Sequence, residues 1–130
     1  VQFKFVTKES NFAIITDLGF GSEYLLRSIS NLNSIVIECN HVDTMLNESD
    51  YPESLKNRIG SKYGHLNNKE AARILQSIKK NNLNFIGAAH LSEKNNDPNL
   101  VRRDLSFALS KDESFIKIID QDDGLNWTTV

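Results

Sequence analysis

The sequence predicts a mixed α/β domain in which a β-sheet is layered against helices. Short apolar runs of strand length alternate with segments of helical period through residues 12–109. Several of the helical segments begin at Ser, Asn or Asp, whose side chains cap helix N-termini. Strand-like pairs separated by polar turns stand at both ends of the chain, at residues 1–16 and 115–130. With 130 residues, the chain is expected to form a single domain, residues 1–130.

The first two strands are expected to form a hairpin. Residues 1–6 alternate apolar and polar side chains, which is typical of a half-buried strand. A polar turn at residues 8–11 separates them from a second strand at residues 12–16. Ser22 then predicts the N-cap of a helix that ends near Asn31.

The next segment is expected to hold a strand, a loop and a short helix. Residues 34–39 are rich in β-branched side chains, which favour strands. Residues 42–50 are polar and predict a loop. Pro52 predicts the start of a helix that ends near Ile59, because proline is well tolerated in the first turn of a helix.

A second helix and an uncharged strand lead to His90. Asn67 or Asn68 predicts the N-cap of this helix, whose inner stripe comprises Ala71, Ile74, Leu75 and Ile78. The strand covers residues 84–89. Its period of two places His90 on the side of the sheet that the buried residues share.

The last part of the chain is expected to contain a helix and a closing hairpin. Asp97 and Pro98 predict a helix start, a cap followed by proline at the first position, and the helix ends near Leu109. Two strands, at residues 115–119 and 127–130, are expected to pair through a turn with Asp-Gly at its centre.

Composition and charge exclude several classes of protein. Charged residues make up 25% of the chain and hydrophobic residues 39%, which is ordinary for a soluble globular protein. The net charge of −2 provides no broad basic field, so any contact with nucleic acid has to come from local Lys and Arg or from a bound metal. A single cysteine, Cys39, fits a reducing cytoplasm. No apolar run approaches the ~20 residues that cross a bilayer, so we expect a cytoplasmic protein without membrane contact.

Ionisable side chains stand at the ends of three predicted strands. Asp17, Glu38 and His90 lie at or beside these ends, and His65 precedes a helix. If the strands are parallel neighbours, the four groups share a crevice at the carboxyl edge of the sheet. A carboxylate with two histidines suits zinc or manganese, although tetrahedral zinc requires at least three protein ligands. From the residues alone, two interpretations remain open. The four groups can form a metal-hydrolase site, or they can be polar strand ends that hydrogen-bond to neighbouring groups.

Other polar residues also have structural interpretations. Cys39 is expected to be a small buried residue rather than a nucleophile. His41 is expected at a loop surface, or in the site if the loop after Glu38 folds inward. Lys56 and Arg58 are candidates for holding phosphates, and a solvated helix face is the alternative.

Motifs distributed over residues 12–96 resemble one protein family. In order, they are Thr16-Asp17-Leu18-Gly19, Glu38-Cys39-Asn40-His41-Val42-Asp43, Tyr51-Pro52-x-x-Leu55-Lys56-x-Arg58-Ile59, Gly64-His65-Leu66-Asn67-Asn68 and Ala89-His90-Leu91-Ser92-Glu93-x-Asn95-Asn96. The series resembles the C-terminal half of metallo-β-lactamase-fold hydrolases of the YycJ/WalJ (VicX) type, which are relatives of ribonuclease Z. The segment Gln121-x-x-Gly124-x-x-Trp127 is similar to the tail of that family.

The resemblance implies a fold and a role for individual residues. The fold would be the C-terminal half of an αββα sandwich, with a mixed sheet flanked by helices and a hairpin at each end. Asp17 would bridge two divalent metal ions, zinc or manganese, and His90 would be a ligand of the second ion. His65, with Glu38 behind it, would protonate the leaving oxygen, because a neighbouring carboxylate orients an imidazole and favours its protonated form.

The resemblance also implies a substrate. Members of this bacterial group are regarded as DNA exonucleases or related phosphodiesterases, so nucleic acid is the expected partner, DNA before RNA. Lys56 and Arg58 would contact its phosphates. The two metals would generate hydroxide and hold the scissile phosphate in line.

The sequence departs from the family pattern in what it lacks. The HxHxDH motif of the family and a further histidine ligand belong to an N-terminal half that these 130 residues do not contain. We therefore expect a chain that begins within a larger protein, is inactive alone and holds none or part of the metal pair. It should expose the sheet face or edge that the missing half would cover, and a second copy should cover that surface in a homodimer or higher assembly. The alternative is a non-catalytic domain or interaction half that pairs with a separate subunit.

Overall fold

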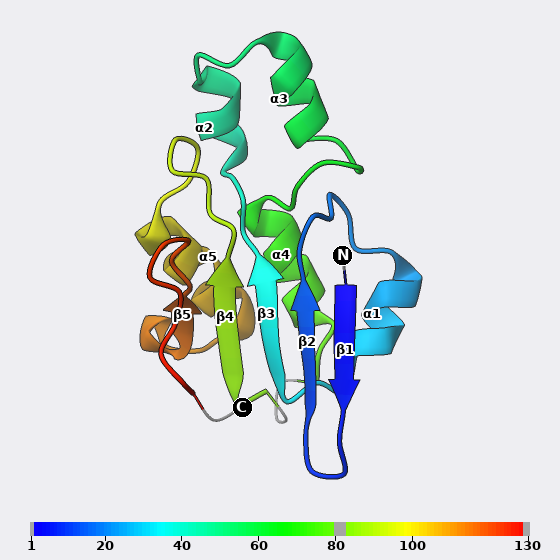
Figure 1. The fold of residues 1–130 in the computed structure, drawn as a ribbon. Coiled ribbons are helices and arrows are strands. Elements are labelled where there is room, and N and C mark those ends of the chain that lie inside the picture. Colours follow the sequence, from blue (N-terminus) through cyan, green and yellow to red (C-terminus); the bar gives the residue numbers. More distant parts are fainter. Residues whose placement is uncertain (1, 80–82, 129–130) are drawn as a thin grey trace.

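The computed structural model describes residues 2–79 and 83–128, which form a five-stranded sheet with helices against it (Figure 1). In spatial order the strands are β1 (Gln2–Val6), β2 (Asn11–Ile15), β3 (Ser34–Glu38), β4 (Phe85–Ala89) and β5 (Ile116–Ile118). β1 pairs antiparallel with β2, whereas β2, β3, β4 and β5 are parallel neighbours. The predicted mixed α/β class and the N-terminal hairpin are confirmed.

The helices are α1 (Glu23–Ile29), α2 (Asp43–Glu48), α3 (Glu53–Ile59), α4 (Asn68–Gln76) and α5 (Pro98–Leu109), followed by a 3₁₀ turn, η2 (Glu113–Phe115). Helices α1, α4 and α5 begin where the sequence predicts side-chain caps. The side chains of Ser22, Asn67 and Asp97 each accept a hydrogen bond from a backbone N–H in the first turn of α1, α4 and α5. Within the described ranges, no helix combines the length and the apolar character needed to cross a membrane.

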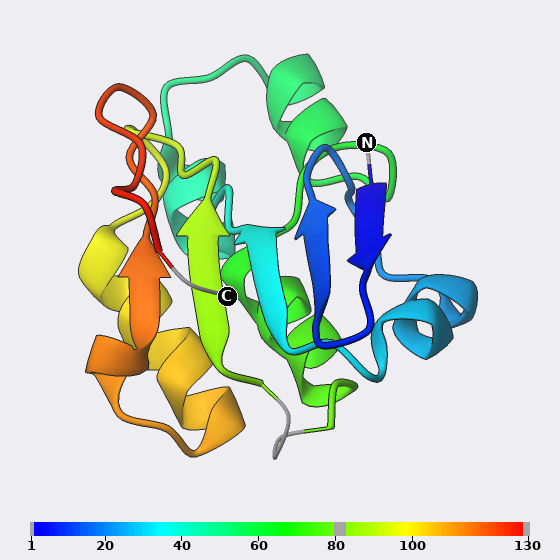
Figure 2. The ribbon, with the colours of Figure 1, turned by 60° about the horizontal axis from the view of Figure 1, so that its bottom comes forward.

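The core lies between the sheet and the helices on one of its sides. Figures 1 and 2 show α4 and α5 against the same face of the sheet. Alternate strand residues point into this core and stand opposite one another across β2, β3 and β4: Ala13, Ile15, Ile35, Ile37, Ile86 and Ala88. They belong to one buried cluster with Ile74 and Leu75 of α4 and Leu105 of α5. This layer fixes the positions of the strand ends.

The opposite face of the sheet carries exposed apolar side chains near β1. Phe5 stacks on Phe12 with ring centroids 5.9 Å apart, and Phe3 stacks on Phe5 at 6.4 Å. Phe3 and Phe5 are each more than half exposed. The structure therefore has the exposed apolar sheet face that was expected from the sequence.

Residues 42–50, expected to be a loop, instead contain the helix α2. No side chain caps its N-terminus, which starts after Val42. The helix is held by tertiary contacts: Leu46 is buried, and Lys56 of α3 donates a hydrogen bond to the carbonyl of Asn47 at 2.7 Å. Short helices depend on packing more than on local propensity, so this helix could not be predicted from its polar sequence.

The closing hairpin is reduced to a turn. Asp120 forms an isolated antiparallel bridge with Gly124, and its carboxylate accepts the backbone N–H groups of Asp122 and Asp123. Residues 127 and 128 are not in a strand, and residues 129–130 of the expected strand lie outside the described residues. Trp127 is fully exposed rather than packed, so this segment lacks the buried face that would hold a second strand.

Candidate metal centre

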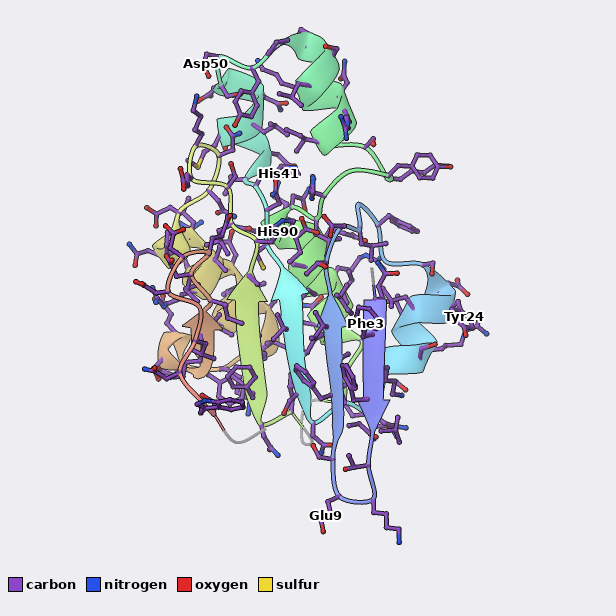
Figure 3. The ribbon with its side chains drawn as sticks, in the orientation of Figure 1. Phe3, Glu9, Tyr24, His41, Asp50 and His90 are labelled. Carbon is purple, nitrogen blue, oxygen red and sulfur yellow. The ribbon has the colours of Figure 1, made fainter. Side chains whose placement is uncertain are left out.

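The carboxyl edge of the parallel strands brings four predicted site residues together. Asp17 follows β2, Glu38 ends β3, His90 follows β4, and His65 lies in the loop before α4. Each offers one potential ligand atom, and these atoms all lie within 4.8 Å of one another. Figure 3 shows His90 at this edge of the sheet. Parallel pairing of β2, β3 and β4 places their carboxyl ends side by side, which accounts for the cluster.

Glu38 is the buried centre of the cluster. Its Oε1 lies 2.5 Å from Nδ1 of His65 and 3.1 Å from Nδ1 of His90. Its Oε2 accepts the backbone N–H of Leu18 at 3.3 Å. A fully buried carboxylate requires such partners, because an unpaired charge in the interior is costly. Glu38 thus orients both imidazoles, whereas the sequence connected it with His65 alone.

The contact with Glu38 leaves the outer nitrogen of both histidines available. A ring that donates from Nδ1 to a carboxylate presents the lone pair of Nε2. The rings of His65 and His90 have centroids 5.5 Å apart and an interplanar angle of 72°. Both side chains are partly exposed. Their Nε2 atoms can therefore ligate a metal or hold a proton at the surface of the site.

Asp17 faces the same two histidines from the end of β2. Its Oδ1 lies 3.9 Å from Nδ1 of His65 and 3.9 Å from Nδ1 of His90. Asp17 and His90 have φ angles of 54° and 60°, and the third non-glycine residue with positive φ in the described ranges, Ser110, ends α5. Such left-handed residues are uncommon and gather at functional sites. Two of them thus stand in this one cluster.

The turn at His90 corrects one expectation from the sequence. β4 ends at Ala89, so His90 does not continue the alternation of the strand toward the helix side. Its positive φ instead turns the ring toward Glu38, which pairs with Ala89 in the neighbouring strand. The Asn40 side chain donates to the His90 carbonyl at 3.1 Å and holds this backbone in place.

The loop that carries Asp17 is packed tightly against the loop that carries His65. At Gly19, a Cβ atom would lie 2.1 Å from the carbonyl oxygen of Ser61. Only glycine permits this close approach of two backbones. This contact fixes the two loops relative to each other, and it thereby positions the Asp17 carboxylate relative to the His65 imidazole.

A charged pair on α4 holds the far end of the Asp17 loop. Glu70 accepts the backbone N–H of Gly21 at 3.0 Å, and Arg73 donates to the Gly21 carbonyl at 2.7 Å. Glu70 and Arg73 also bind each other at 2.6 Å. Burial acts to raise the pKa of Glu70, but hydrogen bonds from Arg73 and Gly21 outweigh it and lower this pKa. Glu70 therefore carries its charge where the loop requires an acceptor.

The cluster opens into a cleft of about 600 Å³. Part of the lining comes from the segment before α4, with Tyr51, Arg58 and Tyr63. Another part comes from the loop after β4 and from the turn near Gln121. The two tyrosines were not predicted as site residues, although Tyr51 stands in one of the family motifs and Tyr63 directly precedes another.

Of the two cations that were proposed from the sequence as phosphate contacts, one lines the cleft and the other does not. Arg58 lines the cleft. Lys56 is not among the lining residues, because its amine binds the Asn47 carbonyl at 2.7 Å and lies 3.3 Å from the carboxylate of Glu53. Lys56 thus joins α3 to α2.

His41 is buried instead of lying at a loop surface. It is not a member of the four-residue cluster, and its Nδ1 has no hydrogen-bond partner within the part of the chain that the structure describes. Its Nε2 lies 3.9 Å from the carboxylate of Asp43. Burial lowers the pKa of His41, and Asp43 opposes this effect only in part.

Cys39 is buried, as predicted. Burial, followed by the charge of Glu38, raises the pKa of its thiol well above the usual range, which leaves it unreactive. Its carbonyl accepts a hydrogen bond from the buried amide of Asn96 at 2.7 Å, and Asn96 also pairs with Asn68. These asparagines join the loop after β4 to α4 beneath the site.

The donor set fits part of a metal centre. Asp17 and His90 offer an exposed carboxylate and an imidazole nitrogen, and Glu38 supplies the outer carboxylate that commonly orients a ligating histidine. Carboxylate and imidazole ligands together suit zinc and manganese.

Comparison with known proteins places this geometry in context. No protein-family model matches the chain. The chain is 35% identical over 109 residues to the exodeoxyribonuclease YycJ of Bacillus anthracis, an alignment that covers 84% of the chain and 41% of that protein. It is 32% identical over 94 residues to the exodeoxyribonuclease WalJ of Streptococcus pneumoniae, covering 72% of the chain and 35% of that protein. The chain thus spans about two fifths of the length of these relatives.

A solved structure shares the architecture. YhfI of Bacillus subtilis, a metallo-β-lactamase fold protein, superposes with a TM-score of 0.65 over 95% of this chain and 42% of its own length. The sequence identity between the two is 16%, so this likeness concerns the fold alone.

Proposed function

Because this chain has the metallo-β-lactamase fold and is similar to exodeoxyribonucleases of the YycJ/WalJ type, as its motifs predicted, we propose that it is the C-terminal part of a metal-dependent phosphodiesterase that degrades DNA. The observation that carries this proposal is the cluster of Asp17, Glu38, His65 and His90 at the carboxyl edge of the sheet. The bacterial sources of the relatives and the single buried cysteine fit an enzyme of the bacterial cytoplasm.

Asp17 and His90 are proposed to hold the metal pair, zinc or manganese. Asp17 would offer its exposed carboxylate, and His90 would offer Nε2, because its Nδ1 is engaged by Glu38. Bound divalent ions supply a nucleophile from water at neutral pH and neutralise charge on a phosphate.

His65 is proposed as the general acid. Its Nδ1 binds Glu38 at 2.5 Å, so the proton to be given away resides on Nε2, at the surface of the cleft. The buried carboxylate compensates the positive charge of the protonated ring and fixes its orientation. Nε2 would give this proton to the leaving oxygen of the phosphodiester.

Arg58 is proposed to bind a phosphate of the substrate, since it lines the cleft that contains the cluster. Lys56 was proposed for the same task from the sequence. Its amine is engaged by Asn47 and Glu53, so its support for substrate binding is indirect, through the packing of α3 on α2.

We propose that these 130 residues are inactive alone, because they carry two of the metal ligands that the family resemblance implies. A second candidate function, an interaction half that pairs with a separate subunit, is favoured by the exposed phenylalanines on the sheet face away from α4 and α5.

A hydrolysis assay separates these functions. The chain is joined to an N-terminal half that carries the HxHxDH motif, and end-labelled DNA and RNA strands are incubated with manganese or zinc. We expect metal-dependent hydrolysis of DNA in preference to RNA, and none by the chain alone. His65→Gln should lower the rate by about 10²–10⁴-fold, as expected for loss of a general acid. Asp17→Ala should abolish hydrolysis, and Tyr24→Ala on α1 should leave it unchanged.

Absence of hydrolysis by the joined protein with either metal would leave the interaction half as the better account. Hydrolysis that survives Asp17→Ala would show that the metal centre lies elsewhere.

A further inference from the structure

The turn after β5 lies beside the turn that carries His90. Parallel pairing places Ile118 of β5 opposite Ala88 of β4, and the backbone N–H of Ile119 donates to the Ala88 carbonyl at 2.8 Å. Just beyond this point both strands leave the sheet, β4 through the left-handed residue His90 and β5 through residues 120–124. Figures 1 and 2 show the turn of residues 120–124, coloured red, next to the loop that follows β4.

Hydrogen bonds hold the turn of residues 120–124 in one shape. The Asp120 carboxylate accepts the backbone N–H groups of Asp122 at 2.8 Å and of Asp123 at 3.1 Å. The Asp120 carbonyl accepts the backbone N–H of Gly124 at 3.1 Å, and Gly124 has a φ of 66°, which glycine adopts without strain. This shape accounts for the glycine of the tail motif and fixes the backbone that carries Gln121.

Gln121 joins this turn to the loop that carries His90. Its side-chain amide donates to the carbonyl of Leu91 at 2.8 Å, and Leu91 directly follows His90. Gln121 also lines the cleft into which the metal cluster opens. The turn after β5 therefore contacts the His90 backbone at the wall of the cleft.

Asn40 holds the same loop from the other side of β4. Its side chain donates to the His90 carbonyl at 3.1 Å, and its own carbonyl accepts the backbone N–H of Ser92 at 2.9 Å. Asn40 follows β3 and Gln121 follows β5, and these two strands flank β4. Side-chain amides from both neighbouring strands thus bind two consecutive carbonyls, at His90 and Leu91.

These bonds act where the backbone is least favoured. A left-handed conformation at a residue with a side chain is uncommon, and it persists only where the surrounding structure holds it. The contact that depends on this conformation is also the longer of the two made by Glu38. Its Oε1 lies 3.1 Å from Nδ1 of His90, compared with 2.5 Å from Nδ1 of His65. The orientation of His90 therefore depends on how firmly its backbone is held.

We propose that Gln121 is a positioning residue for His90. Together with Asn40 it holds the left-handed turn, so that Nδ1 of His90 stays on Glu38 and Nε2 faces the cleft. The turn after β5 thereby supports the metal centre, although it supplies no member of the four-residue cluster. This inference rests on the proposed function, because it concerns how a proposed metal ligand is presented.

The position of the ring proton tests this role in the metal-free chain. NMR of ¹⁵N-labelled histidines in EDTA at about pH 8, where an imidazole is ordinarily neutral, distinguishes a proton on Nδ1 from one on Nε2. His90→Gln assigns the signals. In the wild type we expect the His90 proton on Nδ1, as its contact with Glu38 requires. Gln121→Met keeps the length of the side chain and removes the donor, so the His90 signals should shift toward the Nε2–H form. His65 should keep its proton on Nδ1.

Gln76→Met is the matched control. Gln76 of α4 is exposed, as Gln121 is, and it likewise donates its side-chain amide to a backbone carbonyl, that of Ala108 at 3.2 Å. This variant loses the same kind of hydrogen bond away from the cluster and should leave the His90 signals unchanged. Unchanged His90 signals in Gln121→Met, or the same shift in both variants, overturn the proposal.

Zinc titration of the chain joined to an HxHxDH-bearing half gives a second readout. The affinity should fall about tenfold in Gln121→Met, the lower end of the loss caused by removing an outer partner of a ligating histidine, and stay unchanged in Gln76→Met. Equal affinities of wild type and Gln121→Met overturn the proposal. If the joined wild-type protein binds no zinc, the proposed function fails, whereas the NMR result for Gln121 stands because it is obtained without metal.

Discussion

At the scale of single residues, one buried carboxylate organises the site. Glu38 accepts hydrogen bonds from both histidines and from the backbone of Leu18, and its side chain is fully buried. The two imidazoles are consequently fixed in orientation by the same group. A change at Glu38 should therefore act on both proposed functions, metal binding through His90 and proton transfer through His65.

Glu38→Gln should weaken metal binding and hydrolysis without a large loss of volume. The amide nitrogen of Gln is a donor, and it would face a ring N–H that also donates. We expect a decrease of about 10–100-fold in metal affinity, the usual effect of losing such an outer partner. Zinc titration of the joined protein measures it. Glu23→Gln, at the exposed first turn of α1, is the control, and wild-type affinity in Glu38→Gln would contradict this account.

His41 should make stability depend on pH. Burial lowers its pKa in the folded chain relative to about 6.5, so the unfolded chain binds a proton more readily. The stabilisation is complete above pH 6.5 and is lost as the pH falls toward the folded pKa. One proton contributes at most about 1.4 kcal/mol per pH unit to this slope. Urea unfolding of wild type and His41→Gln over a pH series measures the difference, and parallel curves would contradict the assignment.

At the scale of elements, the site depends on loops that follow parallel strands. The loop after β2 carries Asp17 and is fixed against the loop before α4 by close packing at Gly19, and against α4 by Glu70 and Arg73. The strands determine where these loops start, and Gly19 permits the close approach of the two loops.

Gly19→Ala should destabilise the chain. Its Cβ would lie 2.1 Å from the backbone oxygen of Ser61, so one of the loops has to move. Such overpacking costs about 1–3 kcal/mol of unfolding free energy. Gly60→Ala is the control, because its φ of −79° suits alanine and the nearest atom lies at 3.5 Å. It should change stability by less than about 1 kcal/mol. Similar unfolding midpoints in urea for both variants would refute the close packing.

The parts of the fold that were predicted from sequence are those set by local contacts. The caps at Ser22, Asn67 and Asp97 bind amides two or three residues away, so their signal lies within one turn. The helix α2 was missed because burial of Leu46 and a bond from Lys56 stabilise it, and both depend on the tertiary structure.

The meeting of Asp17, Glu38, His65 and His90 at the strand ends was predicted from the sequence, but their contacts were not. Parallel strands explain why the ends at Asp17, Glu38 and His90 meet, and this much follows from the order of strands and helices. The hydrogen bond between Glu38 and His90 depends on the left-handed backbone at His90. The alternation of side chains along a strand does not predict this conformation. Likewise, burial of His41 results from packing of loops that are distant in sequence.

At the scale of the whole molecule, the sheet is covered by α4 and α5 on one face, while the other carries exposed phenylalanines. The chain spans about two fifths of its relatives, and half of a layered sandwich would have such a face. We propose that a second copy covers this face when the chain is alone.

Sedimentation velocity tests this self-association. The chain should sediment as a dimer or larger assembly at high concentration, and Phe5→Lys should shift it toward monomer, since Phe5 stacks with Phe3 and Phe12 on the exposed face. Phe107→Lys is the control, because Phe107 is also highly exposed but belongs to α5. A clean monomer of the wild type at high concentration would contradict the proposal.

The proposed role of the four-residue cluster as part of a metal centre is tested by counting the tightly bound metal ions. Elemental analysis after dialysis against zinc or manganese is applied to the chain joined to an HxHxDH-bearing half. We expect two ions per molecule in the wild type and in the Tyr24→Ala control, and fewer in both Asp17→Ala and His90→Ala. Equal metal content in wild type and in these two variants would contradict the proposed role.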